Sequence, residues 1–322
     1  MKKGYLYIAI TTILFSSMEI VLKSISNSFS PIQLTFERFF FGGLILLPFA
    51  IKSLKSKDIS INKEDIKQFL FLGFMCVVVS MIFYQLAVTH TKASVVAVIF
   101  SCNPVFVMLF ASIFLKEKIY SHNIVSLILE VIGIIIIINP LSIKLSPIGV
   151  TLTLLAAITF ALYGVLGKKS TSKFGGEIVT CFSFIFGSME MLILILIGHI
   201  SSISSLLTTF NLETFACVPL FTGYNISNIW AIIYAYVFVT GLGYASFFKA
   251  MEKTSANTTS LVFFFKPVLS PILAFIFIKE SIPINMIVGI LFIVFGSIFT
   301  IIRNMSLEDK KSLDCQEEIS SS

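Results

Sequence analysis

Two stretches of the chain decide its fold. They read TKASVVAVIFSCNPVFVMLFASIFLKEKI (91–119) and TSANTTSLVFFFKPVLSPILAFIFIKESI (254–282). The alignment that places Thr91 over Thr254 is called the repeat register below, and in it a proline, a Lys-Glu pair and a glycine recur. The matched residues are Pro104 with Pro267, Lys116-Glu117 with Lys279-Glu280, and Gly133 with Gly296. Two unrelated apolar helices would share some Ile and Phe but not these residue types together, so the match indicates an internal repeat.

The composition places most of the chain in lipid. Of its 322 residues, 57% are hydrophobic and 12% are charged, and the mean hydropathy is +0.98, whereas soluble domains carry about 25% charged residues. The net charge of +6 lies in short loops between apolar runs and forms no basic face, which argues against a nucleic-acid partner. The five cysteines form no CxxC pair and the three histidines are scattered, so we expect neither a metal site nor a cofactor.

The apolar runs predict an all-α integral membrane protein with ten transmembrane helices. A bilayer core needs about 20 mostly apolar residues per helix. Ten segments meet this requirement, at 5–22, 32–51, 69–88, 95–115, 121–139, 148–167, 178–198, 226–248, 259–278 and 284–302. Each half of the repeat then holds five spans, an odd number, so the second half enters the membrane from the opposite side. We therefore predict two inverted five-helix repeats, at 1–140 and 146–303.

The basic residues predict which ends face the cytoplasm. With the N-terminus inside, 17 of the 23 Lys and Arg residues fall on the inner side, four on the outer side and two within helices. Cytoplasmic loops carry such an excess of Lys and Arg, so we expect a multi-pass protein of the cell membrane with both termini cytoplasmic. The Ser- and Thr-rich segment 199–225 is then an outer connection that lies on the interface or forms a cap. The polar residues 304–322 are expected to form a disordered cytoplasmic tail.

The repeat resembles a known family. Ten helices as five plus five, a proline in the fourth helix of each half and the Lys-Glu pair after it are similar to the drug/metabolite transporter superfamily, most closely to its EamA-type permeases. Phe36-Glu37-Arg38-Phe39 also resembles that family's early arginine. The likeness covers about 5–302 and implies a permease for a small molecule in a lipid bilayer; family members carry amino acids, nucleotide sugars, nucleosides or drugs. The long outer segment and Glu130 depart from the family pattern and leave the substrate open.

Lys266 is the strongest candidate for a substrate-binding residue. It lies in mid-helix directly before Pro267, and its repeat partner Asn103 lies directly before Pro104. Proline removes a backbone hydrogen bond, so two such helix breaks would leave free carbonyl groups near the membrane midplane. A Lys at this depth can hold a carboxylate or a phosphate. The competing interpretation is a structural Lys that is paired internally.

Five other ionisable residues lie within predicted helices, where a charge costs about 2.5–3.5 kcal/mol on insertion scales. They are Glu19, Glu37, Arg38, Glu130 and Glu190. Glu19 and Arg38 lie at similar depth on neighbouring helices, so we expect them to form a structural ion pair or a gate. Glu130 and Glu190 are candidates for carrying a coupling proton, or else for pairing with Lys266 or a polar neighbour. Glu37 must point away from Arg38 and faces a cavity or another helix.

These features favour a secondary transporter that works by alternating access and exports a small, amino-acid-like metabolite, with the proton as candidate coupling ion. A channel and an intramembrane enzyme are the alternatives. Few polar residues repeat along one helix face, which disfavours a water-filled pore, and no set of residues for nucleophilic chemistry or phosphate binding is visible, so we expect no enzyme activity. Tyr84 and Gln85 are further candidates for the wall of a substrate cavity. The pattern leaves the substrate, the direction, the coupling ion and the oligomeric state open.

Overall fold

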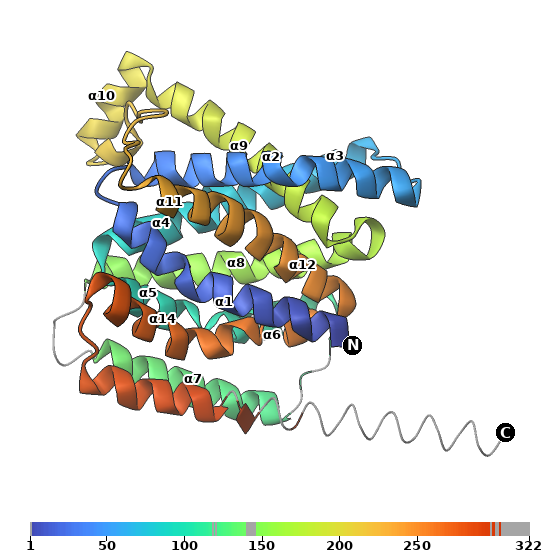
Figure 1. The fold of residues 1–322 in the computed structure, drawn as a ribbon, viewed down its shortest axis with the longest axis vertical. Helices are drawn as coiled ribbons and strands as arrows, with labels where there is room; N and C mark the ends of the chain where they lie inside the picture. The colour runs from blue at the N-terminus through green and yellow to red at the C-terminus, as the bar shows by residue number, and fades with distance from the viewer. Residues whose placement is uncertain are drawn as a thin grey trace.

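The computed structural model describes residues 2–117, 119, 121–139, 146–296, 298–299 and 303 (Figure 1). All regular secondary structure in this part of the chain is helical, and it contains no β-strand. The predicted tail at 304–322 lies outside the described residues. The elements are α1 (Lys2–Ile25), α2 (Pro31–Lys57), α3 (Lys63–Gly73), η1 (Phe74–Ser80), α4 (Met81–His90), α5 (Ala93–Phe100), α6 (Asn103–Phe114), α7 (Ser121–Ile138), α8 (Pro147–Phe174), α9 (Gly176–Gly198), α10 (Ser201–Thr209), η2 (Glu213–Phe215), α11 (Ile229–Ile233), η3 (Tyr234–Gly243), α12 (Tyr244–Lys253), α13 (Ala256–Thr259) and α14 (Val262–Ile278).

Eight helical segments of the described chain are long and apolar enough to cross a bilayer. They are Lys3–Ile25, Pro31–Lys57, Lys63–His90, Ala93–Phe114, Pro147–Phe174, Gly176–Gly198, Ile229–Lys253 and Ala256–Ile278. Each of them overlaps a predicted span. The predicted fifth and tenth spans coincide with shorter apolar helices at Ile124–Ile137 and Ile284–Gly296. The sequence prediction is thus confirmed for the all-α membrane fold and for eight of the spans.

The helices of the two predicted halves are interleaved rather than placed side by side. α1 packs along α14 and α12, and α2 packs against α9 (Figure 1). α8 lies against α4 and α6. Each of these pairs joins a helix of the first half to a helix of the second. The centre of the bundle is therefore an interface between the halves.

The two ends of the bundle differ in charge. The end at which α1 begins carries many of the basic residues and is called the Lys-rich end below. It holds Lys57, Lys168, Lys173, Lys249 and Lys253. The other end carries α10 and the segment that follows it, and is called the α10 end (Figure 1). The predicted outer connection at 199–225 thus contains α10 and η2, and neither of these helices has a buried residue.

Two equivalent spans, one in each predicted half, contain irregular helix. η1 and η3 are π-helical stretches within the third and the eighth predicted spans, and in the repeat register η1 falls inside η3. Such stretches often occur at functional sites. The fourth predicted span is broken at 101–102, directly before Asn103 and Pro104.

The matching break in the ninth predicted span lies earlier than expected. α13 and α14 are separated at 260–261, so Pro267 lies inside α14 and not at the interruption. Backbone hydrogen bonds of the tighter i to i−3 type fill both breaks. A proline disturbs the turn that precedes it, and in the second half this disturbance is displaced toward the start of the span.

α7 packs closely against the helix Ile284–Gly296 at the edge of the bundle. Gly133 permits this approach, because a Cβ there would lie 2.6 Å from the Gly289 carbonyl oxygen. Further along the crossing, the Ser126 hydroxyl donates to the Gly296 carbonyl at 2.6 Å. The repeat register pairs Gly133 with Gly296 and Ser126 with Gly289. The crossing therefore repeats one contact with the roles of the two helices exchanged.

Candidate functional site

A buried ion pair lies where α1 crosses α14. The Lys266 Nζ lies 2.5 Å from a carboxylate oxygen of Glu19, and both side chains are 0% exposed. The Lys266 ammonium also lies 4.8 Å from the ring centroid of Phe100 and 5.6 Å from that of Tyr84. Aromatic faces attract a cation at such distances. Lys266 is therefore paired internally, within a wall of aromatic rings.

This pairing corrects one expectation about the charged residues and removes one of the alternatives for two others. Instead of the expected pair with Arg38, Glu19 forms an ion pair with Lys266. Glu130 and Glu190 are the other candidate partners of Lys266, and neither forms an ion pair with it. The reason is helix packing: α14, which carries Lys266, runs directly along α1, which carries Glu19.

Three uncharged candidates lie near the break of the fourth predicted span or on the helix beside it. Asn103 opens α6, and its amide donates to the Ala157 carbonyl of α8 at 2.9 Å. Tyr84 of α4 packs its ring against Phe100 at 5.0 Å between centroids. Its neighbour Gln85 is buried, and its amide group makes no hydrogen bond within the described chain. The structure thus joins Tyr84 to the Lys266 pair, and it places Asn103 against α8.

Arg38 lies fully buried in α2 and forms no ion pair with Glu19. One of its terminal nitrogens donates to the Met18 sulfur at 3.6 Å, and its Cζ lies 4.5 Å from the ring centroid of Phe39. No carboxylate of the described residues forms a salt bridge with it. The Tyr84 and Tyr244 side chains lie within electrostatic range.

Glu37 points away from Arg38, as expected, and receives donors from the α10 end. Its carboxylate accepts from Tyr224 and Tyr236, both at 2.6 Å, from Gln33 at 2.9 Å and from the Phe221 backbone N–H at 3.3 Å. Burial and the Glu37 carboxylate raise the pKa of Tyr224, so the phenol stays protonated and donates. The contacts hold the segment before α11 onto α2. Sequence reasoning missed both tyrosines, and their only signal was that a buried Glu requires donors.

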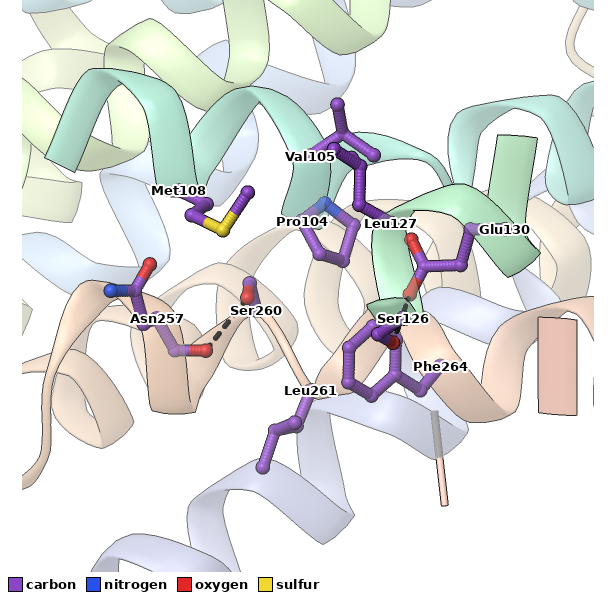
Figure 2. Close-up of a pocket in the computed structure, with 10 residues that line it drawn as sticks. All are labelled: Pro104, Val105, Met108, Ser126, Leu127, Glu130, Asn257, Ser260, Leu261 and Phe264. Carbon is purple, nitrogen blue, oxygen red and sulfur yellow. Dashed lines mark hydrogen bonds between the residues drawn. The ribbon is translucent and has the colours of Figure 1, made fainter. Parts of the chain in front are cut away.

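Glu130 faces a small pocket between the first turn of α6 and the break that separates α13 from α14 (Figure 2). It is buried in α7 and accepts a hydrogen bond of 3.3 Å from Ser126. Pro104 lines the pocket from the start of α6, just after the first break, and Ser260 lines it from the second break. Glu190 lies elsewhere, half-buried on α9, with one carboxylate oxygen that makes no hydrogen bond within the described chain.

The Lys-Glu pairs of the repeat provide helix caps at opposite ends of the bundle. At the α10 end, Glu280 accepts from the N–H groups of Ala93 and Ser94, at 2.9 and 3.1 Å, and from the Ser94 hydroxyl at 2.6 Å. These N–H groups begin α5 and have no partner within the helix, so a carboxylate satisfies them well.

The second cap repeats the first at the Lys-rich end. Glu117 accepts from the N–H groups of Ala256 and Asn257, at 3.3 and 3.4 Å, where α13 begins. In the repeat register Glu117 is equivalent to Glu280, and the N–H groups that it caps are equivalent to those that Glu280 caps. The two caps therefore join the same two predicted spans, the fourth and the ninth, at opposite ends.

Two lysines make a further repeated contact. Lys23 of α1 donates to the Val88 and Thr91 carbonyls at 2.7 and 3.0 Å. Lys168 of α8 donates to the Thr254 carbonyl at 2.9 Å and to that of Met251. A cation at the end of a helix satisfies carbonyl groups that have no partner within it. The two pairs of carbonyls are again equivalent in the repeat register.

The sequence profile of the EamA-like transporter family matches residues 2–139 and 147–302, nearly the whole chain. The chain belongs to the EamA-like transporter family. It is therefore a multi-pass membrane transporter of the drug/metabolite superfamily, with a small molecule as substrate. An uncharacterized transporter of Clostridium kluyveri is 36% identical and aligns over 97% of both chains. An uncharacterized transporter of Archaeoglobus fulgidus is 24% identical over 94% of this chain and 99% of its own.

A solved crystal structure shares the fold of this EamA-family chain. Its TM-score is 0.67 at 15% sequence identity, and the match covers 95% of this chain and 99% of the other. The names of the relatives indicate a transporter rather than an enzyme.

Proposed function

We propose that this EamA-family protein is a secondary transporter of ten spans, built as two inverted repeats, that exports a small metabolite across the cell membrane by alternating access. The observation that carries the proposal is the reciprocal capping by Glu117 and Glu280. Contacts that recur in one register with exchanged roles are expected of repeats related by a two-fold axis in the membrane plane. The crossing of Gly133 with Gly289 supports the same relation.

The caps suggest how the two ends open in turn. Both join the fourth predicted span to the ninth, one at each end of the bundle. A tilt of one span against the other breaks the cap at the opening end and keeps the cap at the closed end. Hydrogen bonds to charged groups contribute about 1.5–3 kcal/mol each, which is enough to hold an end closed and small enough for a substrate to overcome.

We place the substrate between the caps, beside Lys266 and Glu19. These two residues form a buried ion pair at the crossing of α1 and α14, and Tyr84 lies against it. A polar group of the substrate that competes for one member of the pair would bind differently in the inward and outward states, which is the condition for coupling binding to a conformational change. Asn103 and Gln85 are the uncharged candidates on the helices beside it.

Glu130 is our candidate for a proton-carrying residue, and Glu190 is the second. Glu130 is buried, has no cationic partner among the described residues and faces a pocket that lies at the second break and next to the first. A buried carboxyl group without such a partner is more stable when it binds a proton. Its protonation would therefore act where the fourth and ninth spans bend.

The Lys-rich end is assigned to the cytoplasm, because cytoplasmic loops carry the excess of Lys and Arg. The chain then enters the membrane from the cytoplasm at Lys2 and returns there after the tenth span. Export is the direction that we propose.

Flux into liposomes tests the proposal. Purified protein is reconstituted and assayed with labelled amino acids, nucleosides and small organic acids, with and without a pH gradient. We expect saturable flux for one class, at least about 100-fold slower in Lys266→Ala because ligand contacts at a buried charged site contribute several kcal/mol. Lys169→Ala, which removes an exposed Lys near the Lys-rich end, serves as the control and should keep the native flux.

The same assay separates the alternatives. Flux that does not saturate would indicate a channel, and chemical conversion of a solute would indicate an enzyme. Saturable flux that survives in Lys266→Ala would keep the carrier and remove Lys266 from its site. Dependence on the pH gradient that is lost in Glu130→Gln would support proton coupling.

A further inference from the structure

We propose that Arg38 forms an anion-binding subsite in the centre of this transporter, and that the transported solute carries a carboxylate. The inference rests on the proposed transport function and names the chemical class of its substrate. It assigns recognition of the anionic group to Arg38 rather than to Lys266.

Arg38 has donor capacity that the protein does not use. The side chain is 0% exposed, yet its Nε and its second terminal nitrogen make no hydrogen bond within the described chain. Among the described residues, the Met18 sulfur is its one hydrogen-bond partner, at 3.6 Å. A guanidinium presents five N–H donors in a planar fork that matches a carboxylate. A buried charge in this condition is costly unless a ligand pairs with it.

The nearby carboxylates are already occupied. Glu19 is paired with Lys266 at 2.5 Å, so that pair carries no net charge. Glu37 accepts hydrogen bonds from Tyr224, Tyr236 and Gln33 and faces the α10 end. Arg38 is therefore left as a buried cation with no carboxylate partner among the described residues.

Further buried hydroxyl groups lie on helices that pack against η1, which itself contacts α2. The Tyr163 hydroxyl of α8 lies next to the Ser183 hydroxyl of α9 and the Cys76 thiol of η1, and Cys76 lies within electrostatic range of Arg38. The hydroxyl groups of Tyr163 and Ser183 are buried and make no well-formed hydrogen bond within the described chain. Arg38 and these two hydroxyl groups thus lie on three helices that all contact η1, and together they would supply a donor set suited to a carboxylate.

The surroundings of Arg38 indicate the rest of the solute. Phe39 packs edge-on against Phe184 and Tyr244, at 4.7 and 5.6 Å between ring centroids. The Arg38 guanidinium itself lies over the Phe39 ring. An aromatic wall next to an unpaired guanidinium fits a carboxylate that is attached to a small apolar group.

A binding measurement tests the subsite without requiring transport. Thermal unfolding of the detergent-solubilised full chain is followed with 4-methylpentanoate and with leucine, each against its primary amide at equal ionic strength. We expect at least one carboxylate to raise the unfolding midpoint while its amide does not, and Arg38→Gln to abolish this shift. Lys169→Gln, which removes an exposed positive charge, should retain it.

Either of two results overturns the subsite: no carboxylate shifts the wild-type midpoint, or Arg38→Gln shows the wild-type shift. If Arg38→Gln does not fold, Arg38→Lys replaces it, because Lys keeps the charge but loses the planar fork. The apparent dissociation constant should then rise at least about tenfold, and an unchanged constant overturns the proposal.

Flux of the same probes in liposomes distinguishes failure of the subsite from failure of the transport function. Binding that depends on Arg38 without flux would retain the subsite and overturn transport. Equal flux of acid and amide would keep transport and overturn the subsite. Flux of the carboxylate but not of its amide, reduced at least about 100-fold in Arg38→Gln, would support both the subsite and the transport function. The reduction is expected to be large because charge-assisted bidentate pairs are among the strongest polar contacts.

Discussion

The ends of the bundle and its centre differ in how closely the two halves match. At the ends, equivalent residues make equivalent contacts: Glu117 and Glu280 cap helix starts, and Lys23 and Lys168 bind carbonyls at helix ends. At the centre, Lys266 lies where the first half has Asn103. The difference teaches that, under the proposed alternating-access mechanism, the two ends open in turn and need equivalent contacts there. A site for one polar solute does not.

The same contrast holds for the first two spans of each half. Lys23 and Lys168 make equivalent contacts, and an alignment that places Lys23 over Lys168 also pairs Arg38 with Ser183 and Glu19 with Gly164. The charged residues of the centre thus have uncharged counterparts. The predictions below break or sharpen this contrast between matched ends and an unmatched centre, in order of decreasing effect.

The largest effect is expected at the unmatched centre. Lys266→Met leaves Glu19 buried without a partner, so we expect a loss of roughly 3–5 kcal/mol in stability, as in other broken buried pairs, together with loss of flux. Thermal unfolding in detergent and liposome flux measure the two effects. The double variant Glu19→Gln/Lys266→Met should recover most of the stability but not the flux. Recovery of both would show that the pair serves the fold alone.

A smaller loss is expected where α7 crosses the helix Ile284–Gly296. Gly133→Leu forces a side chain against the Gly289 carbonyl, and such overpacking costs about 1–3 kcal/mol. The unfolding midpoint should fall accordingly. Ile135→Leu, on an exposed position of the same helix, should leave it unchanged, and equal midpoints for both variants would contradict the close crossing.

The matched ends should respond in opposite directions. Glu280→Gln weakens the cap at the α10 end and Glu117→Gln weakens the cap at the Lys-rich end, so each should favour opening of its own end by about tenfold, the equivalent of roughly 1.4 kcal/mol. Opening is measured with Ser101→Cys in a background without the native cysteines, because Ser101 is buried at the break of the fourth span. The rate at which a thiol reagent labels this cysteine is followed from each side of the membrane. Faster labelling from the same side in both variants would refute the two-gate arrangement.

The smallest effect tests a contact that the structure shows at the α10 end. The segment before α11 binds Glu37 at the α10 end, and Tyr224→Phe removes one of its donors. Because Tyr236 and Gln33 still donate to Glu37, we expect the free energy that holds this end closed to fall by less than about 1 kcal/mol. The rate of labelling from the α10 side should then rise only a few-fold. Tyr234→Phe is the matched control, because the Tyr234 hydroxyl contacts Ser17 and not Glu37. A larger rise for Tyr234→Phe would contradict the role of Tyr224.

The fold could be predicted because the sequence features that indicate it are local. Long apolar runs identify spans, and the repeated Pro and Lys-Glu pair identify equivalent positions. Lys266 could be singled out because a charge within a span is rare. Its partner could not, because several carboxylates lie at similar depth and only helix packing selects Glu19. The break near Pro267 was misplaced for a related reason: a proline disturbs the turns before it, but the surrounding contacts decide where the helix opens.

The pairing of Lys266 with Glu19 also bears on the response to the membrane potential. A potential of 100 mV contributes about 2.3 kcal/mol for each elementary charge that crosses the membrane. Lys266 and Glu19 are held 2.5 Å apart, so a conformational change that moves them together displaces no net charge through the field. The membrane voltage therefore exerts no net force on this pair. The voltage still acts on any charge that the solute carries across the membrane.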